Sequence, residues 1–207
     1  MAGLREQKHQ LTRNFILDTT YQILAKTGYA EMTMDEVSSQ AGLSKATLYQ
    51  YFPSKDDLVV SVIERRIRHE IDLVRSMDPS LPAIQRLEMM LQNGFKESYL
   101  QGLRVVPKLP LPLWKDTRLS AMRQELMDVL MSLLEEARAA GSIQHYLPAP
   151  VVAELVIGAF NVSVENLRQS LNLSFEAVCD LILKGLLYGI ATPLVQAPAK
   201  PSKPRPS

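Results

Sequence analysis

The segment 32–52 constrains the fold more than any other part of the chain, because it predicts two short helices joined by a very tight turn. Thr33 is a good N-cap residue, and Glu36 three residues later completes the capping-box pattern. Gly42 can end that helix in the left-handed conformation, and Ser44 can cap a second helix immediately afterwards. About three residues between two helices is the geometry of a helix-turn-helix, and it is too tight for two independent amphipathic helices.

The second of these helices has two different faces. At about 100° per residue, Leu48, Tyr51 and Phe52 share one face, which can join a hydrophobic core. The opposite face carries Lys45, Ala46, Tyr49 and Gln50. An aromatic ring beside a lysine on this polar face has no obvious partner within its own domain. The sequence therefore predicts that this face binds another molecule.

The rest of the chain also has helical periodicity, and no useful length of it alternates with the two-residue period of a strand. We therefore predict an all-α fold of about nine helices. The expected helices cover residues 10–27, 33–41, 44–52, 54–76, 83–100, 117–140, 148–170 and 174–191, with a proline-interrupted apolar piece at 105–114. The proline-rich end, 193–207, predicts a disordered tail.

The composition is ordinary for a soluble globular protein, with 46% hydrophobic and 22% charged residues. The longest uncharged run, 185–199, contains two prolines, so no segment reaches the roughly 18 apolar residues that a membrane helix needs. No apolar stretch follows the bases near the N-terminus, which argues against a signal peptide. We therefore expect a cytoplasmic protein.

The sequence offers no catalytic centre, metal site or cofactor motif. The single cysteine, Cys179, lies in an apolar helical pattern and is expected to be a buried structural thiol. The three histidines lie far apart, without cysteine or carboxylate at ligand spacing. Glycine-rich phosphate loops and nucleophile elbows are also absent from the sequence. We therefore expect no enzymatic activity, no metal and no cofactor.

Charge alone does not identify the partner. The formal net charge is +1, and residues 1–60 carry six Lys or Arg against seven Asp or Glu, which gives −1. Placement is more informative than the total, because Asp35, Glu36, Asp56 and Asp57 all fall in expected first helical turns. Acids there complement the helix dipole, so the bases remain free to form a face.

The segment Thr33–Leu58, TMDEVSSQAGLSKATLYQYFPSKDDL, resembles the DNA-binding region of the TetR family of bacterial transcriptional regulators. The likeness in motif covers roughly residues 10–60, and beyond it the layout of helices is similar. The resemblance implies a helix-turn-helix DNA-binding domain at 1–55 and an effector-binding and dimerisation domain at 56–192. The tail at 193–207 would lie outside both.

The resemblance also implies a set of DNA contacts. The expected contacts to backbone phosphates, which fix register without reading sequence, are Thr33, Ser44, Lys45, Tyr49 and Lys55. The bases would be read by Ala46 and Thr47, suited to a thymine methyl group, and by Gln50, suited to adenine. Tyr51 is included among the candidates, but it leans toward the core side, so packing and DNA contact both stay open for it.

By the same layout, the later helices would enclose a small apolar or aromatic ligand. The wall candidates are Met89, Phe95, Tyr99, Leu113, Trp114, Met127, Met131 and Phe160. Asn161 or Glu165 could supply a polar group, and the prolines in 107–112 could open the mouth, near Arg104 and Lys108. Ordinary core filling remains the alternative for the methionines.

The last two long apolar helices predict a homodimer, because their apolar residues exceed what one monomer core can cover. These residues are Val151, Leu155, Val156, Ala159, Val162, Ile182, Leu183, Leu186, Leu187 and Ile190. The leading interpretation is a repressor that binds a palindromic operator and is released by a ligand, with the helix at 54–76 carrying the signal. Two alternatives stay open: an all-helical enzyme or lipid carrier with a substrate cavity, and a DNA-binding protein without an effector.

Overall fold

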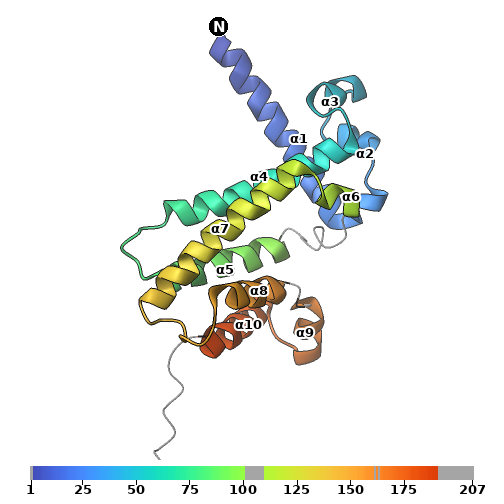
Figure 1. Cartoon of the computed structure of the whole chain (residues 1–207). Coiled ribbons are helices and arrows are strands. Elements are labelled where there is room, and N and C mark those ends of the chain that lie inside the picture. The colour runs from blue at the N-terminus through green and yellow to red at the C-terminus, as the bar shows by residue number, and fades with distance from the viewer. Residues whose placement is uncertain (1, 101–109, 161, 163, 191–207) are drawn as a thin grey trace, which may run out of the picture. The chain divides into compact units, whose positions relative to one another are not determined.

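The computed structural model describes residues 2–100, 110–160, 162 and 164–190. These residues form ten α-helices and no strand, which confirms the all-α prediction. The helices, labelled in Figure 1, are α1 (Ala2–Glu31), α2 (Met34–Gln40), α3 (Lys45–Tyr51), α4 (Lys55–Ser76), α5 (Ala83–Leu100), α6 (Leu111–Trp114), α7 (Thr117–Ala139), α8 (Ala149–Phe160), α9 (Val164–Leu171) and α10 (Phe175–Ile190).

The chain divides into two compact units, Met1–Leu130 and Met131–Ser207, and the division falls within α7. The predicted domain boundary at residue 55 lies inside the first unit and remains a prediction about function. The tail at 193–207, the proline-interrupted segment as far as 109, and Asn161 lie outside the described residues.

The helix-turn-helix is built by the caps that the sequence predicts. Thr33 accepts a hydrogen bond from the Glu36 amide at 3.1 Å and so begins α2. At the other end of α2, Gly42 has φ +63°, and the Leu43 amide donates to the Ser38 carbonyl at 2.9 Å. This is the Schellman ending, which needs a residue that tolerates the left-handed conformation.

The first helix differs from the prediction at its start. It begins at Ala2 and not near Gln10, whereas the predicted end at residue 27 agrees with the non-helical φ of 80° at Gly28. The prediction relied on an apolar stripe, and from Gly3 to Phe15 every residue is exposed or half-buried. Ile16 is the first of the described residues of α1 to be fully covered. Helix formation in those early turns is therefore local and does not depend on a core.

One hydrophobic cluster joins the three head helices, α1 to α3, to α4 and also to the segment around α6. Leu48 and Phe52 of the α3 region are 0% and 1% exposed within it, beside buried residues of α1 and α4. Leu113 and Leu119 belong to the same cluster, and Trp114 packs against it. The helix-turn-helix therefore packs against a hydrophobic cluster that includes residues far from it in sequence.

Polar contacts tie the remaining helices of the first unit to α4. At its first turn, Asp57 pairs with Arg118 of α7 at 2.8 Å. Further along, Arg75 pairs with Glu125 of α7 at 2.8 Å, and Glu70 accepts from the Asn93 side chain of α5 at 3.0 and 3.1 Å. These contacts hold α4 between its neighbours over most of its length.

In the second unit, α10 packs against α8 and α9. The sequence predicted one helix at 148–170, and this is wrong, because α8 ends at Phe160 and α9 begins at Val164 with a bend of 63° between their axes. The apolar pattern continues across the break, so periodicity could not show it. Cys179 is 7% exposed, and burial is the main cause that raises its pKa to about 11, which confirms the buried thiol.

Within the described residues, no single helix is both long and apolar enough to cross a bilayer. Only α8 and α9 taken together reach that length and composition.

Candidate nucleic-acid interface

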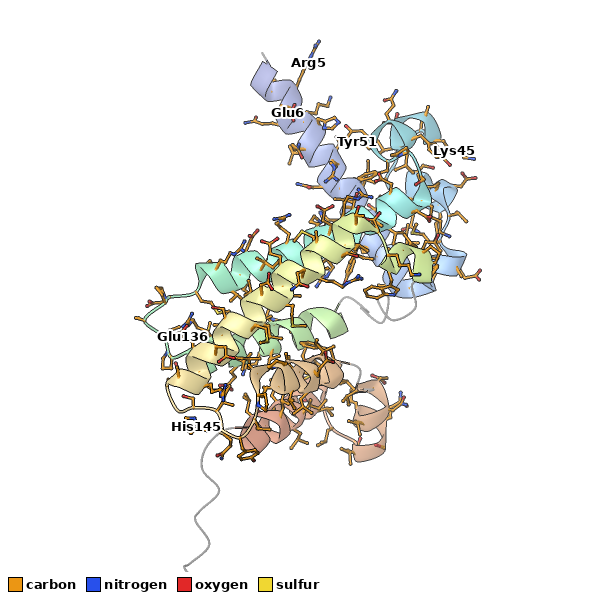
Figure 2. The ribbon with its side chains drawn as sticks, viewed as in Figure 1. Arg5, Glu6, Lys45, Tyr51, Glu136 and His145 are labelled. Atoms are coloured by element: carbon orange, nitrogen blue, oxygen red, sulfur yellow. The ribbon has the colours of Figure 1, made fainter. Side chains whose placement is uncertain are left out.

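The exposed side of α3 is the polar face that the sequence predicts. Tyr49 is 48% exposed, and Lys45, Ala46 and Gln50 are exposed beside it, whereas Leu48 is fully buried. In Figure 2, Lys45 and Tyr51 point to different sides of the short helix. A half-exposed tyrosine among polar groups offers both a ring and a hydroxyl to a partner.

Ser44 fixes the start of α3. Its side chain accepts from the Thr47 amide at 3.1 Å and lies 2.8 Å from the Thr47 hydroxyl. Because Thr47 is held by this contact and is half-buried, it is less free to reach outward than Gln50. Thr33 is exposed and caps α2 in the same way, so both helices present their N-terminal ends through capping hydroxyls.

Lys45 forms an ion pair with Asp35 of α2, with 2.6 Å between the ammonium nitrogen and the carboxylate oxygen. The two side chains are 61% and 64% exposed, so the pair is weak in water. It nevertheless holds the lysine beside α2 at the rim of the polar face. Sequence analysis placed Asp35 only in a helix first turn and missed this contact.

Lys55 is held at the start of α4 by an aromatic ring. Its ammonium lies 4.4 Å from the centroid of the Tyr29 ring, and it donates to the Ala30 carbonyl at 3.4 Å. The Tyr29 hydroxyl donates to Asp56, and this hydrogen bond is the main cause that raises the Tyr29 pKa to about 12. The end of α1 and the start of α4 are therefore fastened together next to a cation.

Two contacts place the first helix beside the recognition helix α3, and sequence analysis missed both. The His9 ring stacks on the Tyr51 ring, with centroids 4.5 Å apart and planes at 22°. The Arg13 guanidinium lies 5.2 Å from the centroid of the Phe52 ring. Tyr51 is half-buried, so it packs on His9 while the residue stays partly exposed. The four-residue spacing of Arg5, His9 and Arg13 was the available signal.

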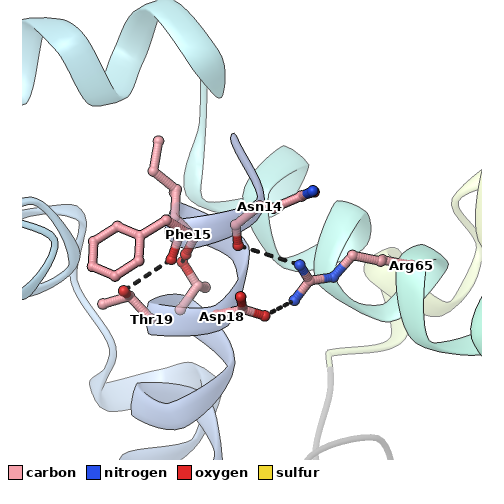
Figure 3. Close-up of polar contacts among 7 residues, drawn as sticks. Asn14, Phe15, Asp18, Thr19 and Arg65 are labelled. Atoms are coloured by element: carbon pink, nitrogen blue, oxygen red, sulfur yellow. Dashed lines mark hydrogen bonds and ion pairs between the residues drawn. The ribbon is translucent and has the colours of Figure 1, made fainter. Parts of the chain in front are cut away.

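A separate clamp fixes α1 to α4, as Figure 3 shows. Arg65 donates to the backbone carbonyl of Asn14 at 3.2 Å and pairs with the Asp18 carboxylate at 2.5 Å. A planar guanidinium can bind two acceptors at once, which fixes orientation as well as distance. This clamp therefore joins the base of the head to the first half of α4.

The candidate ligand residues are spread over both units. Phe95 is buried, Met127 and Met131 are half-buried, and Met89 and Phe160 are 44% and 38% exposed. Leu113 and Trp114 pack on the helix-turn-helix cluster described above. Glu165 is bound on its own helix by Arg168 at 2.9 and 3.0 Å. Side-chain placement of Tyr99 and the position of Asn161 lie outside the described residues, as do Arg104 and Lys108.

Among the described residues, no group of three or more His, Cys, Asp or Glu side chains could hold a metal ion.

Comparison with known proteins identifies the helix-turn-helix. Residues 16–62 match the family described as "Bacterial regulatory proteins, tetR family". The Fatty acid metabolism regulator protein of Bacillus subtilis is 22% identical over 183 residues, which is 84% of this chain and 93% of that protein. The transcriptional repressor KstR of Mycobacterium tuberculosis is 39% identical over 91 residues, which is 44% of this chain and 41% of KstR.

A solved structure has the same fold. The transcriptional regulator FadR from Bacillus subtilis, in complex with stearoyl-CoA, superposes with a TM-score of 0.70 at 19% identity. The superposition covers 85% of this chain and 98% of that one. Residues 16–62, which match the family, contain the capped α2, the turn at Gly42 and the two-faced α3. The chain thus belongs to the TetR family of bacterial regulatory proteins and is a DNA-binding transcriptional regulator, not an enzyme.

Proposed function

We propose that the protein is a homodimeric repressor that binds a palindromic operator and leaves it when a small apolar or aromatic ligand binds. The observation that carries the DNA half of this proposal is the exposed polar face of α3, held in place by the Ser44 cap and by the buried Leu48 and Phe52. Repression is suggested by relatives such as KstR, which is a transcriptional repressor.

In this proposal the residues of the polar face divide into two roles. Backbone phosphates are bound by Thr33, Ser44, Lys45, Tyr49 and Lys55. Bases in the major groove are read by Ala46, Thr47 and Gln50, and Gln50 is supported best because it is exposed and projects from the same face as Tyr49. Lys45 would exchange Asp35 for a phosphate when DNA binds, since both members of that pair face water.

The dimer is supported by one apolar stripe on α8 and beyond its end. Val151 and Leu155 are each 47% exposed and Val162 is 39% exposed, with Gly158 between them. Val151, Leu155 and Gly158 are spaced four and three residues apart on one side of α8, and Val162 follows the end of that helix. The predicted interface was too broad, however, because Val156, Ala159 and Leu183 are buried within the protomer where α10 packs against α8. Ile182, Leu186 and Leu187 are half-buried, and the Ile190 side chain is outside the described residues.

An apolar ligand is supported by the composition of the helices beyond the head and by the chemistry of a relative. FadR of Bacillus subtilis was solved with stearoyl-CoA, a ligand with a long apolar chain. Phe95, Met127 and the other apolar wall candidates suit such a chain better than a ligand with several charges. The domain assignment at 56–192 as effector-binding and dimerising belongs to the same proposal.

The connection between ligand and DNA would be α4. Leu58, in its first turn, is fully buried beneath the recognition helix. Arg118 of α7 binds Asp57 in that same first turn, and Glu125 of α7 binds Arg75 near the other end of α4. A ligand that moves these contacts would move the head with them, and a changed separation of two heads would prevent both from entering their grooves.

Selection from a pool of random duplexes tests the DNA half of the proposal. The purified protein should enrich a symmetric motif whose half-site centres lie about one helical turn apart, roughly 34–36 Å, or slightly more. Enrichment at moderate salt is required, because low salt favours binding to any duplex. A pool without a symmetric motif would leave the operator proposal unsupported.

A further inference from the structure

The first turns of α1 extend beyond the hydrophobic core of the head. The residues from Gly3 to Phe15 are exposed or half-buried, and the N-terminal end of α1 stands clear of the other helices of the head in Figure 1. This stretch carries Arg5, Lys8 and Arg13 against the single acid Glu6. The exposed turns are therefore positively charged, although residues 1–60 as a whole are not.

The charged turns are fixed beside the DNA-reading helix. His9 stacks on Tyr51, and Arg13 lies over Phe52, and both aromatic residues belong to the end of the α3 segment. Residues four apart share one side of a helix, so Arg5 lies on the same side of α1, one turn beyond His9. Figure 2 shows Arg5 at the far end of this helix. The row continues the proposed DNA-binding surface outward from α3.

Two of these cations are free to bind a phosphate. In the part of the chain that the structure describes, the side chains of Arg5 and Lys8 make no hydrogen bond, ion pair or ring contact. The lysines of the helix-turn-helix differ, because Lys45 pairs with Asp35 and Lys55 lies over Tyr29. Long, exposed and unpaired cations next to a DNA-binding surface have the backbone phosphates as their natural partner.

We propose that residues 3–13 of α1 form a second DNA-contacting element, in which Arg5 and Lys8 bind backbone phosphates that flank each half-site. His9 acts as a positioning residue, since its stack on Tyr51 sets the direction of the helix relative to α3. The contacts go to phosphates, so the element adds affinity and length to the footprint without reading bases. The proposal rests on the DNA-binding function.

The apolar residues of the same turns distinguish this proposal from docking of another protein. Leu4, Leu11 and Phe15 are 77%, 70% and 53% exposed, and their spacing of seven and four places them on a stripe separate from the row of Arg5, His9 and Arg13. Lys8, four residues after Leu4 and three before Leu11, lies at the edge of this stripe and not in the row. A protein partner on this stripe would respond to changes in apolar side chains. Phosphate binding would respond to charge and salt.

The experiment compares the full chain with the double variant Arg5→Gln and Lys8→Gln, and with Lys26→Gln as a matched control. Lys26 is an exposed lysine on the same helix, about 30 Å from Arg5 at 1.5 Å per residue. Affinity for a selected operator is measured by fluorescence anisotropy at salt concentrations from about 50 to about 300 mM, a range in which phosphate contacts change the affinity strongly. Each operator is used with long flanks and with flanks cut at the half-site ends.

The slope of log affinity against log salt should become shallower by about 0.9 for each phosphate that the protein no longer binds. The double variant should weaken by the same factor on operator and on random duplex, and cutting the flanks should weaken the wild type but not the variant. His9→Ala should give part of this effect, whereas His9→Phe, which can still stack, should bind as the wild type does. Lys26→Gln should also bind as the wild type does, and circular dichroism should be unchanged in all four variants.

An unchanged slope and affinity in the double variant, with DNA binding intact, would overturn the second contact and leave the regulator itself standing. A loss confined to one base position would also overturn it, because that result means base reading. If the double variant binds normally while Leu11→Ser loses binding, the apolar stripe is the functional surface and phosphate contact is refuted. Failure of the wild type to bind any duplex would instead count against DNA binding.

Discussion

Individual side chains at the DNA interface differ in how firmly the fold holds them, and this decides what each can contribute. Ser44 is held as the cap of α3, and Lys45 is bound to Asp35, so these groups are placed before DNA arrives. Gln50 is exposed and can turn toward a base edge. Preplaced groups suit phosphates, whose positions hardly vary with sequence, and an adjustable amide suits base reading.

Gln50→Ala should relax specificity at one base position and leave the rest of the site unchanged. The expected cost on the preferred operator is about 1–3 kcal/mol if the amide binds adenine with two hydrogen bonds. Tyr49→Phe and Lys45→Ala should instead weaken binding evenly across sequences, because we propose that these side chains bind phosphates. Binding titrations on a set of single-base operator variants separate the two patterns. An even loss for Gln50→Ala would contradict the base-reading role.

Because of Tyr29, the folding stability of the head should depend on pH in the alkaline range. Its pKa is raised from 10.0 to about 12, chiefly by the hydrogen bond to Asp56, so the folded state keeps the phenol proton more tightly than the unfolded chain does. The stabilisation is therefore complete below about pH 10 and is lost as the pH rises from 10 toward 12.

Tyr29→Phe should lower the free energy of unfolding at pH 7 by about 0.5–1 kcal/mol, since this hydrogen bond faces water. The variant should also lose stability less steeply than the wild type between pH 10 and 12. Urea titrations at several pH values measure both effects. Tyr146→Phe, at a side chain 73% exposed, is the control and should change neither. Parallel curves for Tyr29→Phe and the wild type above pH 10 would contradict the role of the Asp56 bond.

At the scale of elements, the turn between α2 and α3 depends on one backbone conformation. Gly42→Ala should destabilise the protein by about 1–2 kcal/mol, because its φ of +63° is unfavourable for a residue with a Cβ atom, although nothing lies within 4 Å of that position. Gly42→Asn should cost less, since asparagine tolerates this region. Gly3→Ala, in an exposed helical turn, should be neutral or slightly stabilising. Thermal denaturation of the three variants gives the comparison, and equal losses for alanine and asparagine would point to another cause.

Helix ends that depend only on neighbouring residues could be predicted from the sequence. Caps at Thr33, Ser44 and Ser54 and stops at Gly28 and Gly141 appear where the residue types require them, because capping depends on only a few neighbouring residues. Periodicity failed where it had no apolar signal to follow, at the exposed start of α1. It also failed where the signal ran through a bend, between α8 and α9.

The interface was predictable in its faces but not in its contacts. The two sides of α3 follow from helix geometry, so the exposure of Tyr49 and the burial of Leu48 could be foreseen. Contacts between distant segments, such as Lys45 with Asp35 and His9 with Tyr51, depend on how the helices pack, and spacing shows only that His9 shares a side of α1 with Arg5 and Arg13. For the same reason Leu113, proposed as a ligand wall, lies in the helix-turn-helix cluster.

For the whole molecule, dimerisation should depend on the exposed stripe of α8. Leu155→Glu should give a monomer of about 23 kDa at micromolar concentration, because a buried unpaired carboxylate is costly at an interface. The variant should also lose its preference for symmetric sites over single half-sites. Tyr146→Glu adds the same charge at an exposed residue away from the stripe and should remain dimeric. Light scattering decides, and a dimeric Leu155→Glu protein would place the interface elsewhere.

Coupling between ligand and DNA should be equal in both directions. A ligand that lowers operator affinity by roughly 5- to 150-fold, or about 1–3 kcal/mol, must itself bind more weakly by the same factor when operator is present. Calorimetric titration of an identified ligand with and without operator duplex measures this factor. Equal ligand affinities in the two titrations would refute the coupling while leaving DNA binding untouched.

The clamp of Arg65 on the α1 backbone has a consequence for how operators can differ. Because α1 is held to α4 at Asn14 and Asp18, we expect a ligand of the proposed dimer to act through the distance and angle between its two heads more than through the shape of either head. Sites with identical half-sites but spacers one base pair apart are rotated by about a tenth of a turn against each other. Such sites would be released at different ligand concentrations, so spacer length would set the order in which promoters respond.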